Sequence, residues 1–190
     1  MATAKTGSFY LTETLTLATT LTDGTRTQGS IDLGAYVDVA SGQAVAIESV
    51  DFIFQSGSDY GMAGVDMLDA SGALSVQLTD LNPGTAFVRA DDHSLVASAA
   101  LNIDRTGTTT SNGNVVSLGS DLYPDNFGPA ALSEAFMVVN DTLYLVAGVD
   151  GATVTAANDL SLTARIKCRV VKLSNKDFMA IAIQSTASDN

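Results

Sequence analysis

The sequence has no tryptophan, one cysteine (Cys168) and one histidine (His93) in 190 residues. A lone cysteine excludes an intramolecular disulfide, and a lone histidine leaves too few of the usual ligands for a multi-ligand zinc site. Aromatic residues are only 6% of the chain, so platforms for stacking sugars or single-stranded bases are scarce. We therefore expect no cofactor, no metal and no catalytic site.

Charged residues are also scarce, at 16% against roughly 25% in an average soluble chain. Hydrophobic residues reach 46%, which argues against a disordered tail. Only three acidic residues are glutamates (Glu13, Glu48, Glu134) and the other eighteen are aspartates, which favour turns over helix interiors. No apolar run approaches about 18 residues, and the segment 1–8 lacks a signal-peptide pattern, so we expect cytoplasmic synthesis and no transmembrane segment.

Alternating apolar and polar residues dominate what is present. In the segment 8–17, Leu11, Leu15 and Leu17 share one parity and threonines share the other, as expected of a half-buried strand. Similar runs predict about ten to twelve strands. We expect hairpins across Ser41-Gly42, across Asn140-Asp141, and between Leu160–Leu173 and Phe178–Gln184. After Pro129, the segment Ala130–Phe136 predicts one short helix.

Neither an internal repeat nor a Pro/Ser-rich linker divides the chain. The pattern therefore predicts a single domain over residues 1–190. So many short strands in a chain of this length indicate two packed antiparallel sheets or a closed barrel. We predict an all-β antiparallel sandwich of jelly-roll type with at most one short helix.

Charge is unevenly distributed: the net charge is −15 up to residue 164 and +3 from residue 165 onward. Arg165, Lys167 and Arg169 share one strand parity, while Ile166, Cys168 and Val170 share the other and are expected in the core. With Lys172, the cations predict a face that contacts an acidic surface of a neighbouring subunit. The alternative is a solvated strand face with edge-protecting charges. We do not expect direct nucleic-acid binding from a chain of net charge −12.

Three other motifs suggest chemistry but have simpler explanations. The segment Asp80–Gly84 begins like a calcium loop, yet Gly84 stands where an oxygen ligand is needed, which favours an ordinary turn. His93 follows Asp91 and Asp92 without a nucleophile motif, which favours a solvated histidine. The sequon that begins at Asn140 is explained equally well by a turn.

Two long strands, 30–39 and 43–55, and the closing segments 162–173 and 178–184 resemble those of the single jelly-roll coat proteins of icosahedral viruses of bacteria and archaea. The resemblance implies an eight-stranded sandwich, self-assembly into capsomers with copies of itself and other virion proteins, a location in the virion, and no catalysis. Many such coats have a basic N-terminal arm, whereas here that region has only Lys5. The alternatives are a tail-tube or capsid decoration protein, or a carbohydrate- or surface-binding sandwich module.

Overall fold

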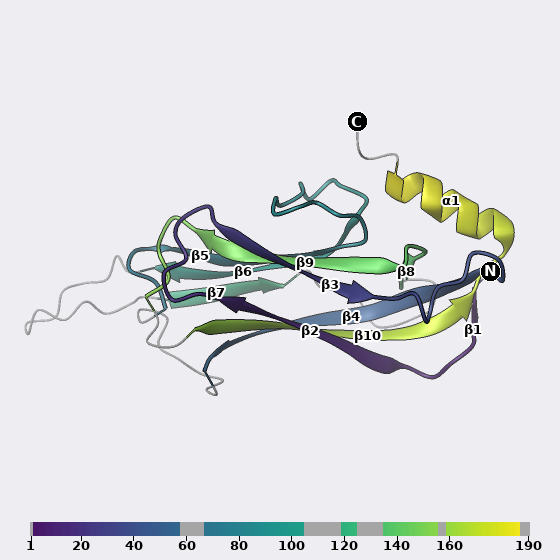
Figure 1. The fold of residues 1–190 in the computed structure, drawn as a ribbon, viewed down its shortest axis with the longest axis horizontal. Coiled ribbons are helices and arrows are strands. Elements are labelled where there is room, and N and C mark those ends of the chain that lie inside the picture. The colour runs from purple at the N-terminus through teal and green to yellow at the C-terminus, as the bar shows by residue number, and fades with distance from the viewer. Residues whose placement is uncertain (1, 58–66, 105–118, 125–134, 156–158, 187–190) are drawn as a thin grey trace, which may run out of the picture.

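The computed structural model describes residues 2–57, 67–104, 119–124, 135–155 and 159–186. In these ranges two antiparallel β-sheets lie face to face, with one helix at an end (Figure 1). Sheet A contains β1 (Thr3–Ala4), β2 (Phe9–Leu17), β4 (Gln43–Ser56), β8 (Phe136–Val138) and β10 (Leu160–Lys172). Sheet B contains β3 (Arg26–Asp32), β5 (Gly72–Thr79), β6 (Leu95–Asp104), β7 (Gly119–Pro124) and β9 (Thr142–Asp150). The prediction of an all-β antiparallel sandwich is confirmed.

The last strand of the chain lies at the centre of sheet A. β4 pairs with β10 along its whole length, while β2 and β1 share the other edge of β10. The order is therefore β10 between β2 and β4, with β8 beyond β4. Sheet B has the order β3-β9-β5-β6-β7. Most pairings thus join strands that are distant in the sequence.

Two predicted hairpins are wrong for a common reason. Across Ser41-Gly42, the flanking strands belong to different sheets, since β3 pairs with β9 whereas β4 pairs with β10. The two segments share one isolated β-bridge, Asp38↔Gln43. Across Asn140-Asp141, β8 pairs with β4 in sheet A and β9 lies in sheet B. A polar turn ends a strand in either case, but it does not say whether the next strand returns to the same sheet.

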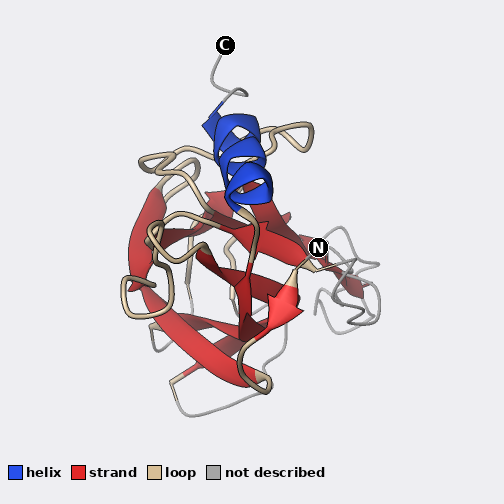
Figure 2. Cartoon of the chain, turned by 90° about the vertical axis from the view of Figure 1, so that its right-hand side faces the viewer, coloured by secondary structure: helices blue, strands red, loops and turns tan. Residues whose placement is uncertain are grey.

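The second strand of the predicted C-terminal hairpin is also wrong, because residues Asn175–Thr186 form the helix α1. Ser174 caps this helix: its hydroxyl oxygen accepts the Asp177 N–H at 3.2 Å, and its carbonyl accepts the Phe178 N–H at 2.9 Å. The helix lies above the strands at one end of the sandwich (Figure 2).

The single short helix was predicted elsewhere, over Ala130–Phe136. Residues 130–134 lie outside the described residues, and Phe136 begins β8. The helix that the structure does describe contains no proline and begins at a serine cap instead.

The core fills the space between the sheets with branched aliphatic side chains. Leu17, Ile47 and Ile166 from sheet A and Leu74 and Leu145 from sheet B are completely buried. Burying one such side chain contributes roughly 1.5–3 kcal/mol, so this layer provides the main stabilisation.

A second, smaller apolar cluster holds α1 against sheet A. Phe178 of the helix is 4% exposed and packs with Ala44, Ala46, Val171 and Leu173 at the ends of β4 and β10. Because these strand residues have the opposite parity to those in the main core, α1 covers the outer face of sheet A at that end.

Candidate functional site

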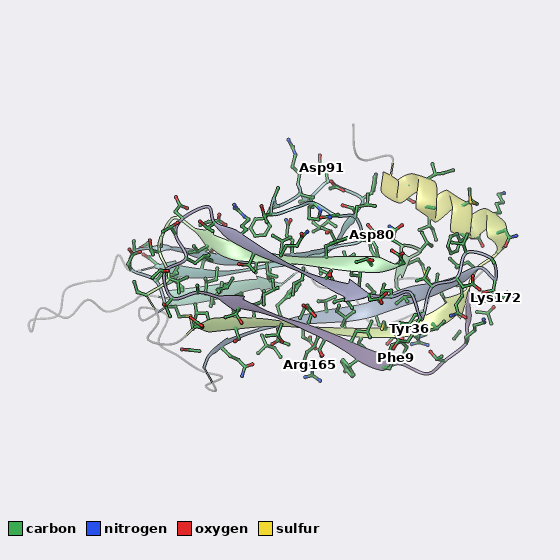
Figure 3. The ribbon with its side chains drawn as sticks, in the orientation of Figure 1. Phe9, Tyr36, Asp80, Asp91, Arg165 and Lys172 are labelled. Atoms are coloured by element: carbon green, nitrogen blue, oxygen red, sulfur yellow. The ribbon has the colours of Figure 1, made fainter. Side chains whose placement is uncertain are left out.

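The two faces of β10 separate as its parity predicts. Ile166 and Cys168 are completely buried and Val170 is 5% exposed, whereas Arg165 points away from the sandwich (Figure 3). Burial and, as a smaller cause, the negative charge of Glu48 together raise the pKa of the Cys168 thiol to about 12. Cys168 is therefore a core side chain and not a nucleophile.

Glu48 is placed on the cationic face by an irregularity in β4. Ile47 lies opposite Cys168 and Ser49 lies opposite Lys167, so Glu48 is an extra residue without a partner in β10. Such a bulge redirects a side chain relative to strict alternation. As a result, a glutamate whose side chain is only 2% exposed lies beside the cations of β10.

Three neighbours bind the Glu48 carboxylate. The ammonium of Lys167 lies 3.2 Å from Oε2, and the guanidinium of Arg169 donates to Oε1. The Ser8 hydroxyl lies 3.0 Å from each carboxylate oxygen. Burial acts to raise the pKa of Glu48, but the hydrogen bonds from Ser8, Arg169 and Lys167 together hold it below its usual range. Glu48 is thus an ionised, hydrogen-bonded carboxylate.

Two of the cations predicted to contact a neighbouring subunit are paired with Glu48 within the chain. These are Lys167 and Arg169, whose side chains are 37% and 24% exposed. Arg165 remains exposed, with its guanidinium 5.0 Å from the centre of the Tyr10 ring and Asp51 opposite it in β4.

Lys172 lies apart from the other three cations. It has the same parity as Val170, not that of Arg169, and it pairs with Thr3 of β1 at the end of the sandwich (Figure 3). The four predicted residues therefore lie in two places. Arg165, Lys167 and Arg169 are on the outer face of β10, and Lys172 is at the end of the sheet.

The segment Asp80–Gly84 forms a turn. The Asn82 side-chain oxygen accepts the Gly84 N–H at 2.9 Å and an N–H of Gln28 at 2.8 Å. No group of three or more His, Cys, Asp or Glu residues with metal-binding geometry occurs in the part of the chain that the structure describes.

Asp80 and His93, which belong to separate motifs in the sequence, lie together in the structure. Asp80 follows the end of β5 and His93 precedes β6, and β5 pairs with β6, so both residues lie at the same end of the hairpin. They line one cavity of about 250 Å³ together with residues of β8 and α1. The strand pairing that brings them together could have been inferred from the two apolar runs on either side of the connection.

Comparison with known proteins assigns no family to the chain. It matches no protein-family model, and no curated protein sequence matches it. Within the described residues, no helix is both long and apolar enough to cross a membrane.

Proposed function

We propose that this protein is a structural virion subunit that self-assembles into a capsid shell and has no catalytic role. The strand order carries the proposal. With β1 and β7 set aside, β2-β10-β4-β8 face β3-β9-β5-β6. Successive strands alternate between the sheets except at β5–β6, which gives two interleaved Greek keys. We assign this order to the jelly-roll type, which is recurrent in capsid proteins.

Exposed apolar side chains support association at the end that carries α1. Four large apolar side chains are exposed among the described residues, and three of them are Val39, Met179 and Ile183, at 66%, 55% and 61%. Met179 and Ile183 are one turn apart on α1. The Gly42 N–H donates to the Val39 carbonyl at 3.3 Å, and Gly42 also binds Leu173, just before the helix. Met179 and Ile183 therefore expose an apolar face of α1, and exposed apolar faces mark many protein–protein contacts.

Imaging of the purified protein by negative stain tests the proposal directly. We expect closed shells or partial shells, because repeated subunits with contacts on more than one side form closed assemblies. Uniform tubes would instead support the tail-tube alternative. Particles that stay dispersed at high concentration, across salt and pH, would contradict self-assembly and favour a binding module.

The contact through Arg165 is tested by charge reversal. We expect Arg165→Glu to weaken assembly about tenfold at low salt and much less at high salt, because an exposed interfacial charge acts mainly on association. The subunit should stay folded, since Arg165 is exposed and forms no ion pair among the described residues. Light scattering against salt concentration measures the effect.

Arg89→Glu is the matched control, because the Arg89 side chain is 89% exposed and lies on a loop far along the chain from β10. Equal assembly of the Arg165→Glu variant and the native chain at every salt concentration would mean that the outer face of β10 is only a solvated surface. Arg169 is unsuitable for this test because it also binds the buried Glu48.

A further inference from the structure

The cavity beside α1 has a polar side and an apolar side. Asp80, His93 and Gln184 provide the polar atoms, and Phe136, Met137 and Ile181 provide apolar walls. Its volume of about 250 Å³ is just below the roughly 300–1,000 Å³ of sites for drug-sized ligands. The space therefore suits a small molecule with one polar end.

Asp80 is the unusual member of this cavity. It is 2% exposed, and its Oδ1 atom has no hydrogen-bond partner in the described part of the chain. Its Oδ2 atom is 3.4 Å from the Asn140 amide nitrogen, a long contact. By contrast, the backbone of Asp80 is fully satisfied: its N–H donates to the Ser94 carbonyl at 3.0 Å, and its carbonyl accepts from Asn140 at 2.9 Å. The backbone of the turn is thus fully bonded, while one oxygen of its buried carboxylate has no hydrogen-bond partner among the described residues.

In the part of the chain that the structure describes, no basic side chain forms an ion pair with this carboxylate. None of the ion pairs among the described residues includes Asp80. Asp92 is close enough for its negative charge to act on the same carboxyl group, and the chain as a whole carries −12. An unpaired buried charge is costly unless a partner binds it. A cation or a strong hydrogen-bond donor would compensate this charge.

We propose that this cavity binds a small organic ammonium ion, with the ammonium N–H groups donating to Asp80 Oδ1 and a short alkyl body against Phe136, Met137 and Ile181. The Gln184 side chain also lines the polar side, and its carbonyl oxygen offers a further acceptor atom. A divalent metal fits less well, since it needs several oxygen ligands and no group of three or more His, Cys, Asp or Glu residues with metal-binding geometry occurs among the described residues. Anions are repelled by Asp80 and Asp92. The site is independent of the proposed assembly role.

Binding of n-butylammonium is the direct test. The full chain is titrated at pH 8 and constant ionic strength, with amide chemical shifts followed by NMR. We expect saturable shifts at Asp80, His93, Ile181 and Gln184. The neutral probe n-butanol should bind at least tenfold more weakly, and butyrate should not bind, because only the ammonium ion compensates the Asp80 charge.

Asp80→Asn keeps the shape of the side chain and removes its charge, so this variant is expected to fold and to bind n-butylammonium at least tenfold more weakly. Asp91→Asn is the control with the same change in net charge, since the Asp91 side chain is 75% exposed and contacts Arg89. Unchanged binding in Asp80→Asn would overturn the proposal. So would equal affinity for n-butanol, or the absence of saturable shifts with n-butylammonium.

Discussion

Asp80→Asn is expected to stabilise the folded subunit by about 1–3 kcal/mol at pH 8. Burial raises the pKa of the Asp80 carboxyl to about 6 from an ordinary value of 3.8, and the nearby charge of Asp92 acts in the same direction. Since one pKa unit corresponds to about 1.4 kcal/mol, an ionised Asp80 lowers the stability by up to about 3 kcal/mol. Asparagine has nearly the same shape and does not have this cost.

The sign of the pH dependence follows from the same shift. The folded state holds the Asp80 proton more tightly than the unfolded chain does, so the Asp80 contribution to stability falls as pH rises from 3.8 to about 6 and then stays low. Asp80→Asn should therefore remove a decline in that window and show its largest gain above pH 7. Denaturant unfolding at pH 4 and pH 8 measures both values.

Asp91→Asn again serves as control, with an expected change within about 0.5 kcal/mol at either pH because the side chain is exposed. A loss of stability in Asp80→Asn at pH 8 would show that Asp80 is compensated in the folded chain. That result would also remove the physical basis for a cation in the cavity. A gain would mean that the chain keeps a destabilising buried charge, as binding sites often do.

The sequence predicts the features of this fold that depend on residues close together in the chain, but not those that depend on distant residues. Period-2 alternation is a local property, and it correctly separated Ile166, Cys168 and Val170 from Arg165. Strand pairing is not local: β10 lies between β2 and β4, more than a hundred residues earlier. The strands on either side of Ser41-Gly42 and of Asn140-Asp141 are therefore predicted to pair as hairpins, whereas in the structure the two strands lie in different sheets.

The helix α1 shows a different source of error. Its residues 178–183 are all apolar, so no periodicity distinguishes a strand from a helix there. The segment 174–177 just before these residues resembles a hairpin turn in composition, which is why a strand is predicted after it. Ser174 and Asp177 have the spacing of a capping box before an apolar run, and that spacing is a helix signal.

The candidate sites were predicted in part, because a chain pattern gives the face of a residue but not its partners. The row of cations on β10 was visible in the sequence, but Glu48 reaches it only through a bulge in β4. The cavity depends on Asp80 and His93 together with β8 and α1. The predicted partner strand of β8 was wrong, and α1 was predicted as a strand.

Glu48→Gln is expected to destabilise the subunit by about 2–4 kcal/mol near pH 7. Removing one partner of a buried ion pair typically costs about 3–5 kcal/mol. The expected loss is smaller here because the Lys167 and Arg169 side chains are partly exposed to water, which weakens the ion pairs. The variant also leaves two cations close together on one strand without a counter-charge. Denaturant unfolding of the dispersed subunit measures the loss. Glu13→Gln is the control, since Glu13 lies on β2, the strand on the other side of β10 from β4.

The pH dependence of this pair has the opposite sign to that of Asp80. Hydrogen bonds hold the pKa of Glu48 below its ordinary value of 4.5, so its stabilisation is fully present above that pH and is lost as pH falls through the folded-state pKa. The native chain and Glu48→Gln should therefore converge in stability at strongly acidic pH. In a double-mutant cycle, Arg169→Gln should cost much less in the Glu48→Gln background than alone, because the contact is then already absent. Additive losses would mean that Glu48 stabilises the fold without this ion pair, and that Arg169 is as available to a neighbouring subunit as Arg165.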